Sequence, residues 1–297
     1  MSVPILNASG CLDALAAPAV ARSLDGFVTK TVTPLPRDGN PPVRIAETDV
    51  GMLNSIGLQN PGIEAFVTDH LPQLAQLAVP IWVSVGGFTA ADYAETCAAL
   101  DPRPEVAALE LNVSCPNVEE APESIAELVA AARAETSKPL YAKLSPAVPD
   151  IAELARAAET SGADGLSLVN TIRGLALDER TLAPRLARGA GGLSGPALKP
   201  LALAAIFACR LATDLPIVGM GGVQTGNDAL ELLAVGACAV SLGTVLFADP
   251  EAPARVRREL GDAAAAHGFA SAADAVGAAH TARGEPALVR DQPKVSV

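Results

Sequence analysis

The chain has 297 residues, of which 50% are hydrophobic and only 3% aromatic, and its formal net charge is −12. An acidic chain without a basic stripe is not expected to bind nucleic acid. Its apolar runs are too short to cross a bilayer, and its first residues lack a secretory signal pattern. We therefore expect a cytoplasmic protein that does not associate with membranes.

The cysteines argue against disulfides and metal centres. Five are scattered along the chain without a CxxC pair, at Cys11, Cys97, Cys115, Cys209 and Cys238. An odd number with this spacing is not typical of a disulfide framework, a zinc site or an iron–sulfur site. We expect reduced thiols and no bound metal.

Eight apolar, β-branched runs recur along the chain and predict strands. They cover 4–9, 26–32, 80–86, 106–113, 140–145, 165–170, 216–222 and 237–244. The segments between most of them have helical patterns, for example 123–136, 151–161, 199–213 and 227–235. Apolar strands that alternate with helices indicate a parallel sheet covered by helices. Eight such units predict one α/β domain over residues 1–297, a (β/α)8 TIM barrel.

Two connections are too long for a plain barrel. The first runs from Thr33 to about Leu71, after strand 2, and the second from Thr171 to Pro200, after strand 6. Long ordered insertions usually carry function. The polar tail from about residue 280 to 297 is either disordered or in contact with a partner, and the sequence leaves both open.

Polar residues and glycines gather where the predicted strands end. They include Ser9, Lys30, Asn112, Lys143 and Asn170. Turns after strands are often polar, but two lysines, two asparagines and a nearby cysteine together are less easily explained in that way. In a barrel, the carboxyl ends of the strands form the active face. We therefore expect these side chains to surround one site.

Glycine clusters follow the last three predicted strands. They are Gly191 to Gly195 in the second insertion, the GMGG segment from Gly219 to Gly222, and Gly243 before Thr244. Glycine lets backbone N–H groups approach phosphate oxygens closely. A single glycine pair indicates only a tight turn, but three loops on one side of the barrel predict a phosphorylated ligand. The Rossmann and P-loop motifs are missing.

The first insertion contains GMLNSIGLQNPG, residues 51–62, which is rich in amides and glycines. Asparagine offers donors and acceptors without charge, which suits a planar ligand with alternating N–H and C=O groups. Taken alone, the segment is better explained as a turn-rich loop. Together with the asparagines near the strand ends, the segment is better interpreted as part of a binding site.

Together these segments resemble a known family. The segments NASG, GMLNSIGLQNPG, ELNVSCPN, YAKLSP, LVNT, GGLSGPALKP, GMGGVQTG and SLGT look like those of class 1 dihydroorotate dehydrogenases, and most like class 1B. The resemblance runs from about Asn7 to Ala275. It implies an FMN flavoprotein, an oxidoreductase that converts (S)-dihydroorotate to orotate in pyrimidine (UMP) biosynthesis.

The resemblance also implies roles for individual residues. For the substrate it implies Lys30, Asn54, Ile56, Gly57, Leu58, Asn112, Asn117, Asn170 and Thr171. For the cofactor it implies Ala8, Ser9, Lys30, Asn112, Lys143, Ser194, Gly195, Gly221, Gly222, Gly243 and Thr244. Cys115 falls on the catalytic base of class 1 enzymes.

The chemistry of the reaction supports a thiol base. Oxidation of a C–C bond beside a carbonyl removes a hydride and a proton, and the proton needs a base opposite the flavin. An unperturbed thiol has a pKa of about 8.5 and becomes a useful base when cations or amide donors favour its thiolate. Lys30 and the asparagines are candidates for that role. We expect Cys97, Cys209 and Cys238 instead to be small buried hydrophobes.

The electron acceptor is left open. Class 1B enzymes pass electrons to NAD through a separate subunit with FAD and a [2Fe–2S] cluster, whereas class 1A enzymes use fumarate. The segments GLQNPG and GGLSGPALKP favour class 1B. A homodimer is common in the family. Three rival interpretations remain. A tRNA dihydrouridine synthase is disfavoured by the acidic composition, and a dihydropyrimidine dehydrogenase, which has a similar Asn…Ser-Cys-Pro segment, is a far longer chain with several clusters. The third is a non-catalytic barrel that binds a phosphorylated metabolite.

One segment departs from the family pattern. Cys11-Leu12-Asp13 stands where class 1B members commonly have Thr-Phe-Gly. This departure falls at the flavin edge that the resemblance implies.

Overall fold

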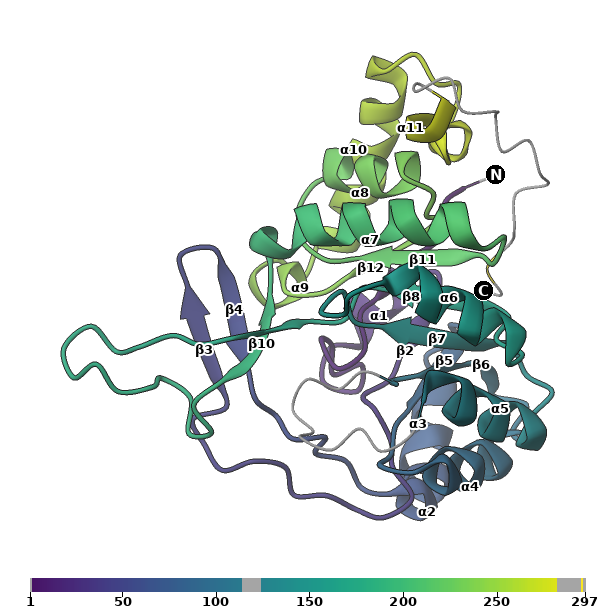
Figure 1. Cartoon of the computed structure of the whole chain (residues 1–297), viewed down its shortest axis with the longest axis vertical. Helices are drawn as coiled ribbons and strands as arrows, with labels where there is room; N and C mark the ends of the chain where they lie inside the picture. Colours follow the sequence, from purple (N-terminus) through teal and green to yellow (C-terminus); the bar gives the residue numbers. More distant parts are fainter. Residues whose placement is uncertain (1, 114–123, 282–294, 296–297) are drawn as a thin grey trace.

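The computed structural model describes residues 2–113, 124–281 and 295. Eight parallel strands form its central sheet, in the order β1-β12-β11-β8-β7-β6-β5-β2. A parallel bridge between Leu6 and Gly26 joins the two ends of this order, so the sheet curls into a nearly closed barrel (Figure 1). The predicted (β/α)8 fold is confirmed.

All eight predicted strands are present. They are β1 Ile5–Asn7, β2 Phe27–Val28, β5 Ile81–Val85, β6 Val106–Leu111, β7 Leu140–Leu144, β8 Gly165–Leu168, β11 Ile217–Met220 and β12 Ala239–Leu242. Each lies inside its predicted apolar run and is shorter than it. The polar residues at the ends of the runs lie outside the sheet and form the rim of the barrel.

Helices cover the outside of the barrel (Figure 1). They include α4 Ala90–Leu100, α5 Ile125–Glu135, α6 Ile151–Thr160, α7 Lys199–Ala212, α8 Gly226–Ala234 and α10 Ala252–Ala266. Shorter helical segments are α1 Pro18–Arg22, α2 Ile63–Ala65, η1 Phe66–His70, α3 Leu71–Ala75, η2 Pro196–Leu198, α9 Val245–Ala248, η3 Ala272–Ala275 and α11 Ala278–Thr281. Capping boxes begin α4, α5 and α8, each with a Ser or Thr and an acidic residue three positions later.

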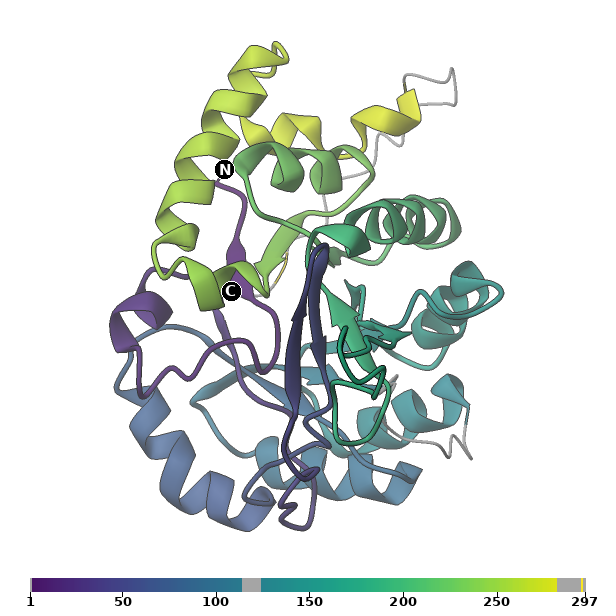
Figure 2. The ribbon, with the colours of Figure 1, turned by 90° about the vertical axis from the view of Figure 1, so that its left-hand side faces the viewer.

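The two predicted insertions pair with each other in a second, antiparallel sheet. Its order is β3-β4-β10-β9, from β3 Ile45–Thr48, β4 Gly51–Asn54, β10 Gly191–Ser194 and β9 Ile172–Gly174. β3 and β4 cross in front of the barrel in Figure 2, and the sheet stands to one side of it in Figure 1. The cluster from Gly191 to Gly195, predicted to be a loop, is therefore mostly a strand.

Strand periodicity divides the barrel residues into two sets. Leu109 and Leu111 of β6 belong to the large core that includes the helices, whereas Ala108 belongs to a smaller cluster with Trp82 and Tyr141. This smaller cluster fills the lower part of the barrel interior. Within the residues that the structure describes, no helix is long and apolar enough to cross a membrane.

The predicted tail lies mostly outside the described residues. His280 belongs to α11, is buried, and stacks on Phe207 with ring centroids 4.1 Å apart. Val295 is also buried, in the small cluster inside the barrel.

Candidate functional site

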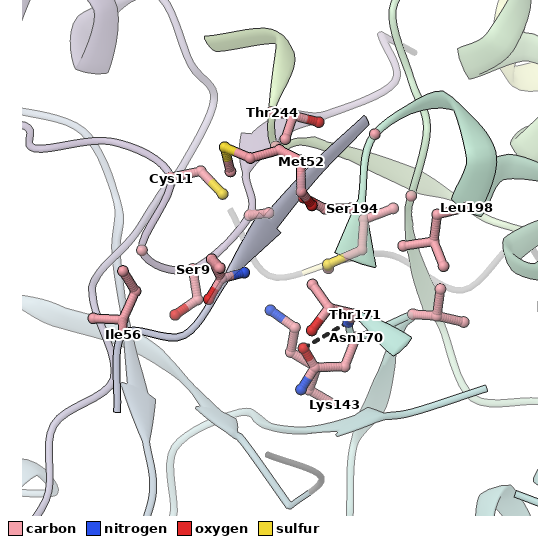
Figure 3. A pocket seen from close by; sticks show the side chains of 18 of the residues that line it. Ser9, Cys11, Met52, Ile56, Lys143, Asn170, Thr171, Ser194, Leu198 and Thr244 are labelled. Carbon is pink, nitrogen blue, oxygen red and sulfur yellow. Dashed lines mark hydrogen bonds between the residues drawn. The ribbon is translucent and has the colours of Figure 1, made fainter. Parts of the chain in front are cut away.

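A cavity of about 240 Å³ lies at the carboxyl end of the barrel strands. Figure 3 shows side chains from several elements around it, including Ser9, Lys143, Asn170 and Thr244. Every described residue of the predicted site lines it: Ala8, Ser9, Lys30, Asn54, Ile56, Gly57, Leu58, Asn112, Lys143, Asn170, Thr171, Ser194, Gly195, Gly221, Gly222, Gly243 and Thr244. Cys115 and Asn117 lie outside the described residues.

Hydrogen bonds fix the amides of the cavity. The Asn112 Nδ2 donates to Thr31 Oγ1 at 3.2 Å, and its Oδ1 accepts from Asn170 Nδ2 at 3.0 Å. The Asn170 Oδ1 in turn accepts from the backbone N–H of Thr171 at 2.8 Å. Tyr93 of α4 donates its hydroxyl proton to the carbonyl of Asn112 at 2.8 Å. Because these bonds link the loops after β6 and β8, both asparagines are held in fixed orientations.

The second sheet delivers residues from both insertions to the same cavity. Asn54 of β4 is the register partner of Gly192 on β10, and Met52 is the partner of Ser194. A Cβ atom at Gly192 would lie 2.3 Å from Thr171 Oγ1, so glycine is needed for β10 to pass this close. The glycines of β10 are thus explained by strand packing.

The glycine loops after β11 and β12 differ in what they indicate. Gly222 has a φ of +78°, and a Cβ there would lie 2.6 Å from Lys199 Cβ, so its turn and packing require glycine. A Cβ at Gly243 would meet only Ala8 Cβ at 3.7 Å and Cys11 Sγ at 3.8 Å, both ordinary contacts. Packing therefore does not explain Gly243, whose backbone faces the open cavity.

Two lysines supply positive charge. The Lys143 Nζ lies 3.3 Å from the Oε1 of Glu110, and both side chains are almost fully buried. Lys30 lies beside Gly10, where a Cβ atom would be 3.2 Å from its Nζ. Glycine at position 10 leaves room for the Lys30 side chain. The cavity therefore combines cations, amides and accessible backbone.

Sequence reasoning missed part of the lining. Besides Gly10, Cys11 and Thr31, the cavity is lined by Ile45, Met52, Val169, Leu198, Met220, Val223 and Phe247. Cys11, Val169 and Met220 lie at or just beyond strand ends, so the rule that found Ser9 and Asn170 could have included them. Ile45 and Met52 belong to the second sheet, whose pairing the sequence pattern did not reveal.

The four described cysteines are free thiols. Burial raises the pKa of Cys97 and Cys209 to about 12, and that of Cys238 to about 11. Cys97 and Cys209 are fully buried in the large core, as expected of small hydrophobes. Cys238 is only partly buried. Cys11 is also only partly buried; its burial raises its pKa, although Lys143 and Lys30 oppose the shift.

Comparisons with known proteins agree with this fold and site. The dihydroorotate dehydrogenase family model matches residues 1–263. A dihydroorotate dehydrogenase B (NAD(+)) catalytic subunit from Desulforudis audaxviator is 44% identical, over 95% of both chains. A Solibacter usitatus protein, named as dihydroorotate dehydrogenase A (fumarate), is 47% identical over 86% of both.

A solved structure is similar in fold. The dihydroorotate dehydrogenase of Eimeria tenella, in complex with ferulenol, superposes with a TM-score of 0.79 at 23% identity, over 93% of this chain and 85% of that one. At this identity the likeness concerns the fold alone. The family model and the curated relatives carry the assignment, and members of this family are flavin-dependent oxidoreductases. The chain belongs to the dihydroorotate dehydrogenase family.

Proposed function

We propose that the chain binds FMN in this cavity and oxidises (S)-dihydroorotate to orotate in pyrimidine biosynthesis. The observation that carries the proposal is the composition of one cavity, in which two lysines, three asparagines and glycine loops meet. We further propose that residues 1–297 act as a single domain. The donors and acceptors that line the cavity suit a flavin with a substrate beside it.

The residues present fit FMN. At the Gly243 end, open backbone and the Thr244 hydroxyl suit the phosphate, with Gly221, Gly222 and Ser194-Gly195 nearby in the lining. Ala8 and Ser9 also line the cavity and belong to the same proposed cofactor set. Lys143, a cation at the buried end, suits a group that gains negative charge on reduction.

Amides would bind the substrate. Dihydroorotate has ring N–H and C=O groups, which match the donors and acceptors of Asn54, Asn112 and Asn170. Asn117 belongs to the same proposed set, with Thr171 and the backbone of residues 56–58. Lys30 would pair with the substrate carboxylate. Because hydrogen bonds within the protein fix Asn112 and Asn170, little entropy is lost when the ring binds.

The oxidation converts a ring C–C bond into a double bond. FMN, when bound, accepts the hydride from one carbon. Cys115 would accept the proton from the other carbon as a thiolate, and Lys30 and the asparagine amides would favour that ionised state. The proton would later leave from the Cys115 thiol to solvent, which restores the base.

For the electron acceptor, we propose NAD, reached through a partner subunit with FAD and a [2Fe–2S] cluster, on a homodimer of this chain. Relatives from Desulforudis audaxviator and Listeria welshimeri named as NAD(+)-type catalytic subunits support this, at 44% and 46% identity. Fumarate is the second candidate, since the Solibacter usitatus relative carries that name at 47% identity.

A direct test uses the purified chain. We expect a yellow protein whose flavin absorbance is bleached by dihydroorotate under anaerobic conditions. Fumarate alone should restore the colour slowly, and NAD only with the partner subunit. A colourless chain that binds no FMN would refute the proposed function, whereas rapid reoxidation by fumarate would replace only the acceptor.

The proposed base is tested by Cys115→Ala, with Cys115→Ser as the matched variant. We expect Cys115→Ala to keep FMN but to lose turnover by at least about a hundredfold, the scale of a general base. Cys115→Ser should retain more activity at high pH, because a hydroxyl is a far weaker acid than a thiol. Full activity in the alanine variant would rule out this role.

A further inference from the structure

Glu110 is the only buried acidic residue among those that the structure describes. It belongs to β6, two residues beyond Ala108, which packs in the apolar cluster, and two before Asn112, which lines the cavity. Its side chain is 1% exposed. Burying a carboxylate is costly unless it is paired, so a reason for its presence is needed.

Its partner is the ammonium of Lys143, 3.3 Å away. Lys143 lines the cavity and Glu110 does not, so Glu110 stands behind the lysine. The Cys11 thiol, which lines the same cavity, responds to both charges. Burial is the largest influence on its pKa and raises it; Lys143 and Lys30 lower the pKa, and Glu110 raises it. The negative charge of Glu110 therefore reaches the cavity.

Fold stability is a poor explanation for this pair. Replacing a buried ion pair with well-packed apolar residues is often neutral or stabilising, since desolvation offsets the attraction. One layer lower, the same strands carry Ala108 and Tyr141 in a tightly buried apolar cluster. An apolar residue at position 110 would extend the apolar interior by one layer, yet a carboxylate is present.

We propose that Glu110 is a positioning residue that holds the Lys143 ammonium at the base of the cavity and offsets its charge there. This rests on the proposed binding of FMN. A lone lysine would strongly favour the added negative charge of a reduced flavin. With Glu110 behind it, the flavin is held less strongly in the reduced form, and electrons pass more readily to an acceptor of low reduction potential.

The test is Glu110→Gln, because glutamine can still accept a hydrogen bond from Lys143 but carries no charge. The readout is the midpoint potential of bound FMN, measured on enzyme without substrate, together with the FMN dissociation constant. We expect retained FMN and a higher potential. The shift should favour reduced flavin by about tenfold, or about 30 mV for a two-electron couple.

Two variants make the result decisive. Ser167→Ala is the matched control, since Ser167 is the register partner of Lys143 on β8 and its buried hydroxyl has no hydrogen-bond partner. It changes no charge and should leave the potential unchanged. Glu110→Asp, one methylene shorter, should weaken the pairing and raise the potential by a smaller amount. If Glu110→Gln does not fold, the flavin potential of Glu110→Asp tests the proposal in its place.

The failures are distinguishable. Wild-type protein that binds no FMN refutes the proposed function and this inference with it. Wild-type protein that binds FMN, with folded Glu110→Gln at the wild-type potential, overturns the role of Glu110 alone. If only Glu110→Asp folds, a flavin potential equal to that of the wild type would likewise overturn the role of Glu110. A shift of equal size in Ser167→Ala would also overturn it, because charge would then not be the cause.

Discussion

Two layers of the barrel interior differ sharply although the same strands build them. The lower layer contains Trp82 and Tyr141, fully buried with ring centroids 4.5 Å apart. Two residues further along, β5 carries Ser84 and β7 carries Lys143, both buried. Because side chains alternate along a strand, a step of two residues stays inside the barrel and moves toward its mouth. Between these two pairs of positions, the barrel interior changes from a packed core to the base of a binding site.

The comparison teaches that the two layers are held by different forces. The lower layer depends on burial of large apolar side chains against one another. The upper layer depends on pairing, between Glu110 and Lys143 and between the hydroxyls of Thr31 and Ser84 at 3.0 Å. Substitutions in the lower layer should therefore change stability alone, whereas those in the upper layer should also change ligand chemistry.

The largest expected effect is in the lower layer. Trp82→Ala removes a fully buried ring and leaves a cavity beside Tyr141, which costs about 3–5 kcal/mol of unfolding free energy. Denaturant unfolding measures the loss. The fraction that remains folded should keep its FMN affinity within about twofold. A variant that is stable but has lost FMN would show that the two layers are not independent.

In the upper layer, Lys143→Met leaves Glu110 buried without its cation. We expect a loss of about 3 kcal/mol, since removing one partner of a buried pair is strongly destabilising. The double variant Lys143→Met/Glu110→Leu should recover most of that stability, because both charges are then absent. FMN affinity and turnover should stay low in both. Restored turnover in the double variant would refute a functional role for the pair.

The sequence could predict the barrel because local pattern determines it. Runs such as PIWVSVG and VAALELNV identify strands, and the polar residues at strand ends, among them Ser9, Lys143 and Asn170, meet at one cavity as their positions predict. Such predictions need only periodicity and the parallel arrangement of the strands.

The rest could not be predicted because it depends on long-range pairing. The alignment of β4 with β10 joins residues about 140 positions apart, and no local pattern specifies that register. The sequence therefore did not predict Met52 as a residue of the site. Glu110 was missed for a different reason: one charged residue in an apolar run gives no sign of the partner that it meets across the sheet.

A smaller effect concerns the rim above the upper layer. Thr225 is the N-cap of α8, and Asp228 closes its capping box and also accepts from Lys199 Nζ at 2.7 Å. Burial alone would raise the pKa of Asp228, but hydrogen bonds from Lys199, Gln224 and Thr225 hold it below its ordinary value. Asp228→Asn should cost about 1 kcal/mol and also weaken FMN binding, because the box fixes the loop that carries Gly222.

This stabilisation has a defined pH dependence. A depressed folded-state pKa gives stability that is present above the unfolded pKa of about 3.9 and is lost as pH falls through the folded value. The difference between wild type and Asp228→Asn should therefore shrink below about pH 4. Asp92→Asn is the matched control, since Asp92 closes the same kind of box on α4, but the loop before α4, residues 86–89, does not line the cavity. It should lose similar stability and keep FMN; equal loss of FMN in both would contradict the specific role of Asp228.

The smallest effect is expected at Cys11, the thiol at the departure from the family pattern. Burial raises its pKa, so it should be protonated at neutral pH despite two nearby lysines. Alkylation at pH 7.5, followed by mass spectrometry, should label it at least about tenfold more slowly than an exposed thiol. Its rate should still be rising with pH well above 8.5, where an ordinary thiol approaches its limit. Cys11→Ser should change the unfolding free energy by less than about 0.5 kcal/mol. Fast labelling at neutral pH would mean that the lysines outweigh burial there, and the upper layer would then be more electropositive than its paired charges imply.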